Sequence, residues 1–273
     1  MGENFSKLRT MAGWKVILLM LATFIGFLFL YSLGQSVDIP DVIMGVQIPI
    51  FILMSALIVV LYGYLMKSLE GRWSQTLNFS RLIPELSKGL VIGIVYFLLV
   101  TFVMYLLGSY SIKDAVWQVD FLRMLALFLL VACREEVLFR GILFRFIEQR
   151  WNYAIALTIS SLIFGIAHLF NDGATIWGSL AIVVEAGLLL GVAYQKSGNL
   201  WLPIGIHWAW NVMEGPVLGF AVSGTNSSSI IHPVISGSEL ITGGVFGAEA
   251  SIIALFWGVI LTLLIAYFPS NKS

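Results

Sequence analysis

The sequence predicts an all-α protein, a polytopic transmembrane helical bundle with about eight membrane-spanning helices. Of its 273 residues, 59% are hydrophobic and only 11% are charged, and the mean hydropathy is +0.94. A soluble domain carries roughly 25% charged residues, so this composition is typical of a membrane protein. Apolar runs of about 20 residues recur along the chain, and each is long enough to cross a hydrocarbon core ~30 Å thick.

The apolar runs follow one another with short polar connections. We therefore expect a single transmembrane domain over residues 1–273, with no separate soluble domain. The first run has a charged start and continues to about Leu33 without a small-x-small cleavage site, so we expect an uncleaved helix rather than a signal peptide. The predicted spans are residues 14–34, 45–66, 88–108, 121–144, 153–170, 178–195, 200–222 and 248–268.

The positions of lysine and arginine predict the orientation of these spans, because basic residues are enriched in cytoplasmic loops. The odd-numbered connections hold Lys113 and otherwise acidic or neutral residues such as Asp38, Asp41, Asp172 and Glu239. Both ends and the even-numbered connections hold Lys7, Arg9, Lys15, Lys67, Arg72, Arg81, Lys88, Arg140, Arg145, Arg150, Lys196 and Lys272. We therefore expect both termini to be cytoplasmic.

Composition and motifs also argue against several kinds of function. The net charge is zero and no basic tract stands out, so no nucleic-acid partner is expected. The single cysteine, Cys133, excludes an internal disulfide framework. No HExxH motif occurs, which argues against a membrane metalloprotease of that type.

The fourth predicted span contains the segment CREEVLFRG, which places several charges at membrane depth. Such a charge costs ~2.5–3.5 kcal/mol on insertion scales and therefore usually has a purpose. Glu136 and Arg140 are four residues apart with the glutamate first, the favourable order for an ion pair on a helix. Glu135 points about 100° away and has no partner at that spacing, which leaves it free for chemistry. The alternative is a purely structural cluster of ion pairs at the cytoplasmic boundary.

Two further predicted spans carry histidine. The fifth ends in FGIAHLF, where Phe164 and His168 are four residues apart and share one helix face. The seventh contains GIHWAWN, where His207 and Asn211 have the same spacing. Polar side chains on an apolar helix must face protein or water rather than lipid. Taken one helix at a time, packing or interhelical hydrogen bonding also accounts for these residues.

Together the three spans offer a carboxylate, two imidazoles and an amide, which a helical bundle can bring together in its core. Such a set could activate a water and stabilise an oxyanion, as hydrolysis of an acyl bond requires. A metal site made by Glu135, His168 and His207 is the second possibility, since some zinc hydrolases use two histidines and one glutamate. The residues alone do not decide between the two.

The order EExxxR, FxxxH and HxxxN, each in its own apolar span, resembles the CAAX protease and bacteriocin-processing (CPBP, or Abi) intramembrane proteases. This family includes the type II CAAX prenyl protease. In this chain the motif residues are Glu135, Glu136, Arg140, Phe164, His168, His207 and Asn211. The segment EAGLLLGVAYQKSGNLWLPIGIHWAWN also looks like the family's glycine-rich helix and the turn that follows it. The resemblance covers roughly residues 120–215, which we take as the catalytic core.

The resemblance implies a role for each motif residue. Glu135 would be the general base that activates water, and His168 would position that water or share its proton. His207 and Asn211 would stabilise the oxyanion on the scissile carbonyl, and the ion pair of Glu136 would be structural support. The family has been described both as metallopeptidases and as glutamate-dependent without a catalytic metal. We favour the metal-free mechanism and expect no cofactor, with Zn²⁺ as the alternative.

The resulting prediction is an intramembrane endopeptidase that hydrolyses a peptide bond of a membrane-associated protein or peptide. Prenylated CAAX proteins and peptide precursors such as pheromones or bacteriocins are both candidate substrates. A non-catalytic membrane immunity or scaffold protein of the same fold is one alternative. A transporter is another, although we find no paired repeats or broken helices in the two halves. The short loops favour a bacterial cell membrane.

Three more residues are of interest. Glu185 faces into the sixth predicted span, either as a hydrogen-bonded acid or as part of a cavity lining. Cys133 could be a nucleophile with His168 as its base, but a small buried residue is the more usual role. His232 lies in the 223–247 connection and is expected to be a loop residue. One difficulty is that Glu135 and His168 lie at different distances from their helix ends, so helix tilt must bring them to one depth.

Overall fold

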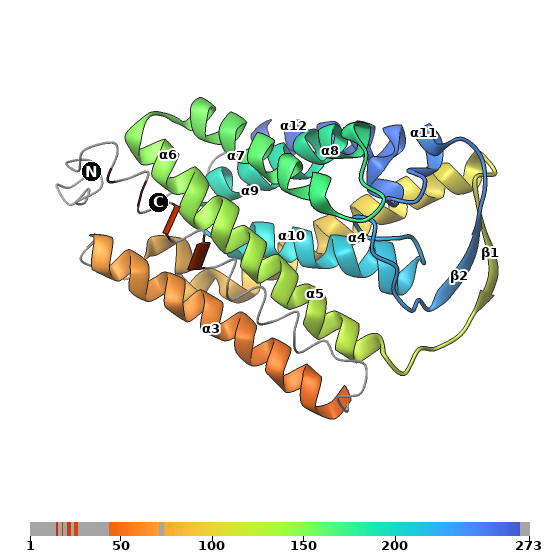
Figure 1. Ribbon diagram of the computed structural model, residues 1–273, viewed down its shortest axis with the longest axis horizontal. Coiled ribbons are helices and arrows are strands. Elements are labelled where there is room, and N and C mark those ends of the chain that lie inside the picture. Colours follow the sequence, from red (N-terminus) through yellow and green to blue (C-terminus); the bar gives the residue numbers. More distant parts are fainter. Residues whose placement is uncertain are drawn as a thin grey trace.

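The chain folds into a bundle of helices with a small sheet at one end (Figure 1). The computed structural model describes residues 15, 18, 21–22, 25–26, 44–70 and 74–267. The predicted first span, 14–34, lies outside these residues apart from isolated positions. The elements up to residue 150 are α3 (Met44–Glu70), η1 (Gln75–Leu77), η2 (Phe79–Arg81), α4 (Leu82–Leu106), β1 (Tyr110–Ala115), α5 (Phe121–Glu136), η3 (Val137–Phe144) and α6 (Arg145–Arg150).

The second half of the chain runs from α7 to α12 and ends in one more apolar helix. Its elements are α7 (Tyr153–Ala167), η4 (His168–Phe170), α8 (Ile176–Ile182), η5 (Val183–Leu188), α9 (Leu189–Ser197), α10 (Trp201–Val212), η6 (Met213–Val217), β2 (Ile231–Ile235), α11 (Glu239–Thr242), η7 (Ala248–Ala250) and α12 (Ile252–Tyr267). Helix α10 contacts α4, α5 and α9 and lies in the middle of the bundle, while α3 runs along α5 on one side (Figure 1). Every residue of α10 except Trp208 is buried, so this helix forms the centre of the core.

Within the described residues, four helical segments are long and apolar enough to cross a membrane by length and composition. They are Gly45–Glu70, Gln75–Leu106, Tyr153–Phe170 and Ile176–Ser197. Apolar side chains project from this kind of helix into the surroundings: Leu53 of α3 is 67% exposed. Several apolar helices thus present the surface of a membrane protein.

The predicted number of about eight spans is not confirmed. The predicted span 121–144 is helical, but the charges of CREEVLFRG make it too polar to qualify as an apolar span. Helix α12 has 16 residues, fewer than the ~20 that a perpendicular crossing needs. Helix α10 with η6 covers Trp201–Val217 and is also short for a crossing. Of these two, α12 is the strongly apolar helix.

The predicted all-α class is wrong in one respect, because β1 and β2 form a small antiparallel sheet. Tyr110 pairs with Ile235 at one end and Ala115 with Ile231 at the other, with a bulge between Ile112 and Asp114. His232 therefore lies in a strand rather than a loop, and its Nδ1 bonds the Asp114 carboxylate. The sheet lies at one end of the molecule and joins the start of α5 to the segment that precedes α12 (Figure 1).

The hydroxyl of Tyr110 fastens this sheet to the bundle. It donates to the carbonyl oxygen of Leu218 at 2.9 Å, and the ring stacks on Phe220 with centroids 5.2 Å apart. Burial raises the pKa of Tyr110 to about 12, so the phenol keeps its proton and remains a hydrogen-bond donor. The sheet is thereby held against the segment that follows η6.

Glycine residues let α4 and α10 approach each other at backbone distance. A Cβ placed on Gly93 would lie 2.6 Å from the carbonyl oxygen of Ile206, and one on Gly205 would lie 2.5 Å from that of Leu86. Small residues of this kind allow close helix packing in a membrane, where apolar surface alone does not draw helices together. Because Ile206 precedes His207, this contact also fixes the position of a predicted site residue.

Three helices change from α to π geometry beside a buried glutamate. The π segment η3 begins directly after Glu136, η5 contains Glu185, and η6 contains Glu214. All three of these glutamates are fully buried. Insertions of this kind are frequent at functional sites, because they re-aim side chains within an otherwise regular helix.

Gly93→Ala should destabilise the bundle, because the added methyl group has no room between α4 and α10. Overpacking typically costs ~1–3 kcal/mol, so the thermal midpoint of the purified protein in detergent should fall. Gly45→Ala is the matched control, since a Cβ there meets nothing within 4 Å. Equal midpoints for the two variants would contradict the proposed contact.

Candidate active site

One cavity of about 480 Å³ brings together the four side chains predicted to be catalytic. Glu135 enters it from α5, His168 from η4, and His207 and Asn211 from α10. The expected difference in depth between Glu135 and His168 does not keep them apart, since both line this cavity. Part of the remaining wall comes from the segment between η6 and α12, which contributes Val222, Ser223, Thr225, Ser227 and Glu249.

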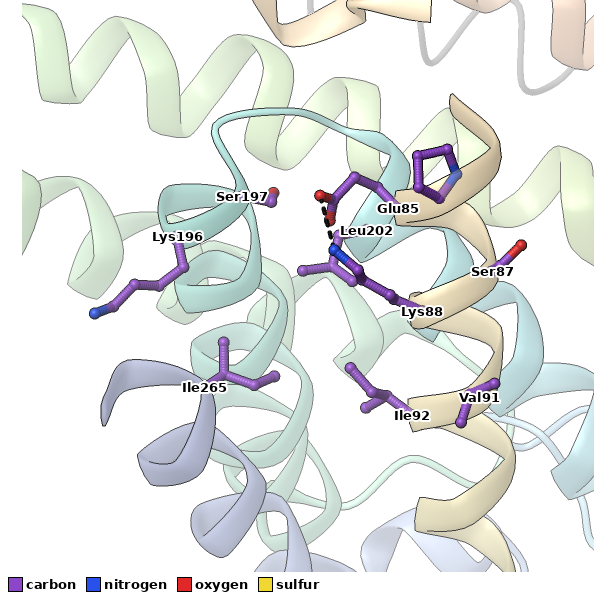
Figure 2. A pocket seen from close by; sticks show the side chains of 10 residues that line it. Glu85, Ser87, Lys88, Val91, Ile92, Lys196, Ser197, Leu202 and Ile265 are labelled. Atoms are coloured by element: carbon purple, nitrogen blue, oxygen red, sulfur yellow. Dashed lines mark hydrogen bonds and ion pairs between the residues drawn. The ribbon is translucent and has the colours of Figure 1, made fainter. Parts of the chain in front are cut away.

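A second cavity of about 510 Å³ lies elsewhere, among α4, α9, α10 and α12 (Figure 2). None of the predicted catalytic residues lines it. Figure 2 shows Lys88 reaching Glu85, with Nζ and Oε1 3.3 Å apart. Glu85 also pairs with Arg81 at 2.8 Å. Because its carboxylate is neutralised by ion pairs and its other lining is mostly apolar, this cavity is not the candidate active site.

Glu135 has a charge partner that helical spacing did not predict. Its Oε1 accepts from Nη2 of Arg134 at 2.6 Å, so the prediction of an unpaired carboxylate is wrong. Adjacent residues point about 100° apart on a helix, and the long arginine side chain closes that gap. The second oxygen, Oε2, is 3.8 Å from Nε2 of His207. The Glu135 carboxylate is thus ion-paired through one oxygen and faces histidine with the other.

The predicted ion pair between Glu136 and Arg140 is present and completely buried. Oε1 of Glu136 accepts from Nη1 of Arg140 at 2.8 Å. Nη2 of Arg140 also donates to the carbonyl oxygens of Ala186 and Gly187 at 3.3 Å each, and its guanidinium lies 4.5 Å from the centre of the Phe164 ring. The pair therefore ties η3 to η5 and to α7.

Glu136 also holds His207, so its contacts exceed the predicted pairing with arginine. Nδ1 of His207 lies 2.8 Å from Oε1 of Glu136. An ionised carboxylate can only accept, so this nitrogen carries a hydrogen and Nε2 is directed at Glu135. The imidazole is therefore oriented by one glutamate and presented to the other.

His168 has its tautomer set by the backbone. Its Nδ1 lies 2.7 Å from the carbonyl oxygen of Phe164, which can only accept, so Nδ1 is the protonated nitrogen. In the neutral ring Nε2 then carries a lone pair and can accept a proton or a water hydrogen. The Phe164 ring contacts both histidines, with centroids 4.7 Å from His168 and 6.2 Å from His207.

The Asn211 side chain is 5% exposed and lines the cavity. It makes no hydrogen bond with any residue that the structure describes. A buried amide without a partner is costly, and its hydrogens are available to an incoming acceptor. The neighbouring indoles are engaged: Nε1 of Trp208 donates to the carbonyl oxygen of Leu125 at 3.0 Å.

Two carboxyl groups near the cavity were missed in the sequence. Glu249 lines it, and Glu214 lies directly behind Glu249. Both fall in predicted spans, 248–268 and 200–222, so the cost of charge at membrane depth could have singled them out. Glu185 does not line the cavity; its Oε2 accepts from the hydroxyl of Tyr96 at 3.0 Å.

A zinc site at Glu135, His168 and His207 is the alternative that the sequence left open. Among the described residues, no group of three or more His, Cys, Asp and Glu side chains is arranged to hold a metal ion. Oε1 of Glu135 is bonded to Arg134, and Nδ1 of His207 to Glu136. Oε2 of Glu135 and Nε2 of the two histidines are therefore the atoms that a zinc ion would bind there. Cys133 is buried and does not line the cavity, so it has no access to a substrate there.

Comparison with known proteins identifies a related family. Residues 116–213 match the family described as type II CAAX prenyl endopeptidase Rce1-like. The resemblance carried by the three motifs is therefore confirmed over a region that contains all four cavity residues from α5, η4 and α10. Over this central region, the chain is similar to membrane peptidases of the type II CAAX prenyl endopeptidase kind.

Two curated relatives match shorter parts of the chain. An Escherichia coli protein named "Uncharacterized 24.3 kDa protein" is 33% identical over 120 residues, which cover 43% of this chain and 49% of that protein. A Bacillus subtilis (strain 168) protein named "Putative membrane peptidase YdiL" is 31% identical over 77 residues, 28% of this chain and 29% of that protein. The chain thus spans about half the length of one relative and less than a third of the other. No solved structure matches.

Glu136→Gln should act mainly on stability, because it removes the charge partner of both Arg140 and His207. Breaking one side of a buried ion pair costs ~3–5 kcal/mol. Less folded protein should be recovered from membranes, and it should unfold at lower temperature. Glu239→Gln is the matched control, since Glu239 is exposed at the start of α11 and does not line the cavity. A variant at position 136 as stable as this control would contradict the structural role.

Proposed function

We propose that this protein is an intramembrane endopeptidase that hydrolyses a peptide bond of a membrane-associated protein or peptide. The observation that carries the proposal is the convergence of Glu135, His168, His207 and Asn211 on one cavity. These residues come from separate helices of an apolar bundle, where leaving them in lipid would be costly. The match of residues 116–213 to the Rce1-like family supports the same activity.

Glu135 is the proposed general base. Arg134 stabilises its ionised form through Oε1 and leaves Oε2 open to the cavity. Water held between Oε2 and the lone pair on Nε2 of His168 would lose a proton to the carboxylate as it attacks the substrate carbonyl. Because Nδ1 of His168 is bonded to a backbone carbonyl, the ring cannot turn its donor side to that water without breaking this bond.

Asn211 and His207 are the proposed oxyanion donors. The Asn211 amide has hydrogens to offer in a site where desolvation strengthens each polar contact. When Nε2 of His207 is protonated, it is a second donor, since Glu136 holds the other nitrogen and prevents rotation of the ring. Both residues lie on one face of α10, four residues apart. The charge that develops on the carbonyl oxygen would thus meet two donors from one rigid helix.

This mechanism needs no metal, and we propose that the protein works without one. The base, the water-positioning nitrogen and the oxyanion donors are all supplied by side chains that line the cavity. Activity that survives exhaustive chelation, and that added Zn²⁺ does not raise, is the expected outcome. Loss of activity with a chelator and its return with Zn²⁺ would overturn this part of the proposal.

The matched family supports a first substrate class to test. The printed description of that family names a CAAX prenyl endopeptidase, so a peptide with a prenylated C-terminal CAAX sequence is the first to test. Both curated relatives come from bacteria, which supports a bacterial cell membrane as the location. In such a host, precursors of secreted peptides are the second substrate class.

Glu135→Gln should abolish cleavage while the folded protein persists. Glutamine keeps the shape of the side chain but cannot accept the proton of water, so the rate should fall by ~10²–10⁴. The measurement is cleavage of a farnesylated CAAX peptide per mole of folded protein. In parallel, peptides from membranes and medium of cells that express each form identify natural substrates.

Glu239→Gln serves again as the control and should retain the wild-type rate. If Glu135→Gln cleaves as fast as the wild type, the catalytic assignment is wrong. If neither the wild type nor the variant cleaves any peptide and the two peptide pools are identical, a non-catalytic immunity or scaffold protein becomes the better reading.

The orientation proposed from the basic residues places both termini in the cytoplasm. Reporters fused within residues 67–88 should then behave as cytoplasmic, because this connection carries Lys67, Arg72, Arg81 and Lys88. Reporters fused within residues 223–230 should behave as external. An external signal from the 67–88 fusion would reverse the proposed orientation.

A further inference from the structure

Two buried carboxyl groups meet at the wall of the candidate active site. Glu249 is 2% exposed and lines the cavity, and Glu214 behind it is fully buried. The backbone N–H of Glu249 donates to Oε1 of Glu214 at 3.0 Å, and the two carboxyl groups share one donor, the indole N–H of Trp210. Neither residue has a role in the mechanism described above.

The hydrogen-bond donors around Glu214 and Glu249 can stabilise one negative charge on the two carboxyl groups. Nε1 of Trp210 points between the two groups and donates to Oε2 of Glu214 at 3.2 Å and to Oε2 of Glu249 at 3.3 Å. The hydroxyl of Ser223 donates to Oε1 of Glu249 at 2.6 Å. No lysine or arginine of the described chain pairs with either carboxyl group.

This geometry requires one proton between the two groups. Two ionised carboxylates that share one N–H donor, buried and without a cation, repel each other strongly, so one of them stays protonated. A proton shared by Glu214 and Glu249 turns repulsion into a hydrogen bond. Glu185, which is bonded to Tyr96, lies on the side of Glu214. The other ionisable groups on the cavity side are Arg134, Glu135, His168, Asp172 and His207.

The cavity that Glu249 faces also has separate signs of a ligand site. Asn211 is nine-tenths buried, lines the same cavity and has no partner among the described residues. Nε2 of His168, which faces this space, has no hydrogen bond within the described chain either. The Asn211 amide and Nε2 of His168 are therefore available to bind a substrate or its water. Glu249 is therefore a carboxyl group that lines the same cavity as these two polar groups.

We propose that Glu249, which shares a proton with Glu214, is the general acid that protonates the departing amine. This inference rests on the proposed peptidase function. Water gives its proton to Glu135 and its hydroxide to the carbonyl carbon; the C–N bond then breaks, and the nitrogen takes the proton of Glu249. The proton on Glu135 returns to the pair through water, so no proton is gained or lost by the protein. Glu214 is a positioning residue that keeps the proton available.

The test compares two forms of one substrate: a farnesylated CAAX peptide with its scissile amide, and the same peptide with a thioester there. An amine must be protonated to leave, whereas a thiolate leaves unaided because the pKa of a thiol is about 8.5. Glu249→Gln should lower amide cleavage ~10²–10⁴-fold and thioester cleavage less than about tenfold. Glu214→Gln should show the same preference in weaker form.

Glu135→Gln separates this inference from the function on which it rests. Since both substrates need an activated water, that variant should lose amide and thioester cleavage together. If it loses neither, the peptidase proposal fails. If it loses both while Glu249→Gln keeps wild-type amide cleavage, or loses both substrates equally, the peptidase proposal stands and the assignment of Glu249 is wrong.

A measurement without substrate covers the case in which a variant folds poorly. Infrared spectra of the purified wild-type protein at neutral pH should contain the C=O stretch of a protonated carboxyl group. That band should weaken in Glu214→Gln and in Glu249→Asp, and should be unchanged in Glu239→Gln. Absence of the band from the wild type would show that the pair holds no proton and would overturn the proposal.

Discussion

A single buried oxygen organises the centre of this protein. Oε1 of Glu136 accepts from Arg140 on the same continuous helix and binds Nδ1 of His207 on α10. A charge in an apolar bundle must be paired, because desolvation of an isolated carboxylate is very costly. The pairing requirement therefore dictates how α5, α10 and, through Arg140, η5 and α7 are placed. Because Oε1 of Glu136 binds both partners, the His207 ring is held in one orientation beside Glu135, which lines the cavity.

The same requirement explains why the site has so many polar groups in so apolar a chain. Each motif helix carries polar side chains on one face, and exposing them to lipid would be costly. These faces are therefore turned toward one another. Glycine contacts between α4 and α10 let the two backbones pack closely, which fixes the position of α10 and its polar side chains. The π segments beside Glu136, Glu185 and Glu214 turn these side chains inward without ending their helices. Packing and polar pairing thus work on the same helices.

Helical spacing in the sequence was enough to predict the Glu136–Arg140 pair and the shared faces of Phe164 with His168 and of His207 with Asn211. It could not predict the bond between Arg134 and Glu135, because neighbours on a helix diverge and only the path of a long side chain decides their contact. The sheet of β1 and β2 was also missed, since each strand is short and its partner lies over 100 residues away. Charge content, rather than helix formation, separates the predicted span 121–144 from the four apolar spans.

Part of the cavity wall lies outside the region that matches the Rce1-like family. The match to the Rce1-like family ends at residue 213, one residue before Glu214, whereas Ser223 and Glu249 lie beyond it. The segment that carries them is held to the rest by the bond from Asn171 to the Ser223 carbonyl oxygen and by the sheet. The four predicted catalytic residues and the pair of Ser223 and Glu249 are therefore supplied by separate stretches of polypeptide. Exchange of the later stretch would alter the cavity wall and remove Glu249, while the side chains from α5 and α10 stay in place.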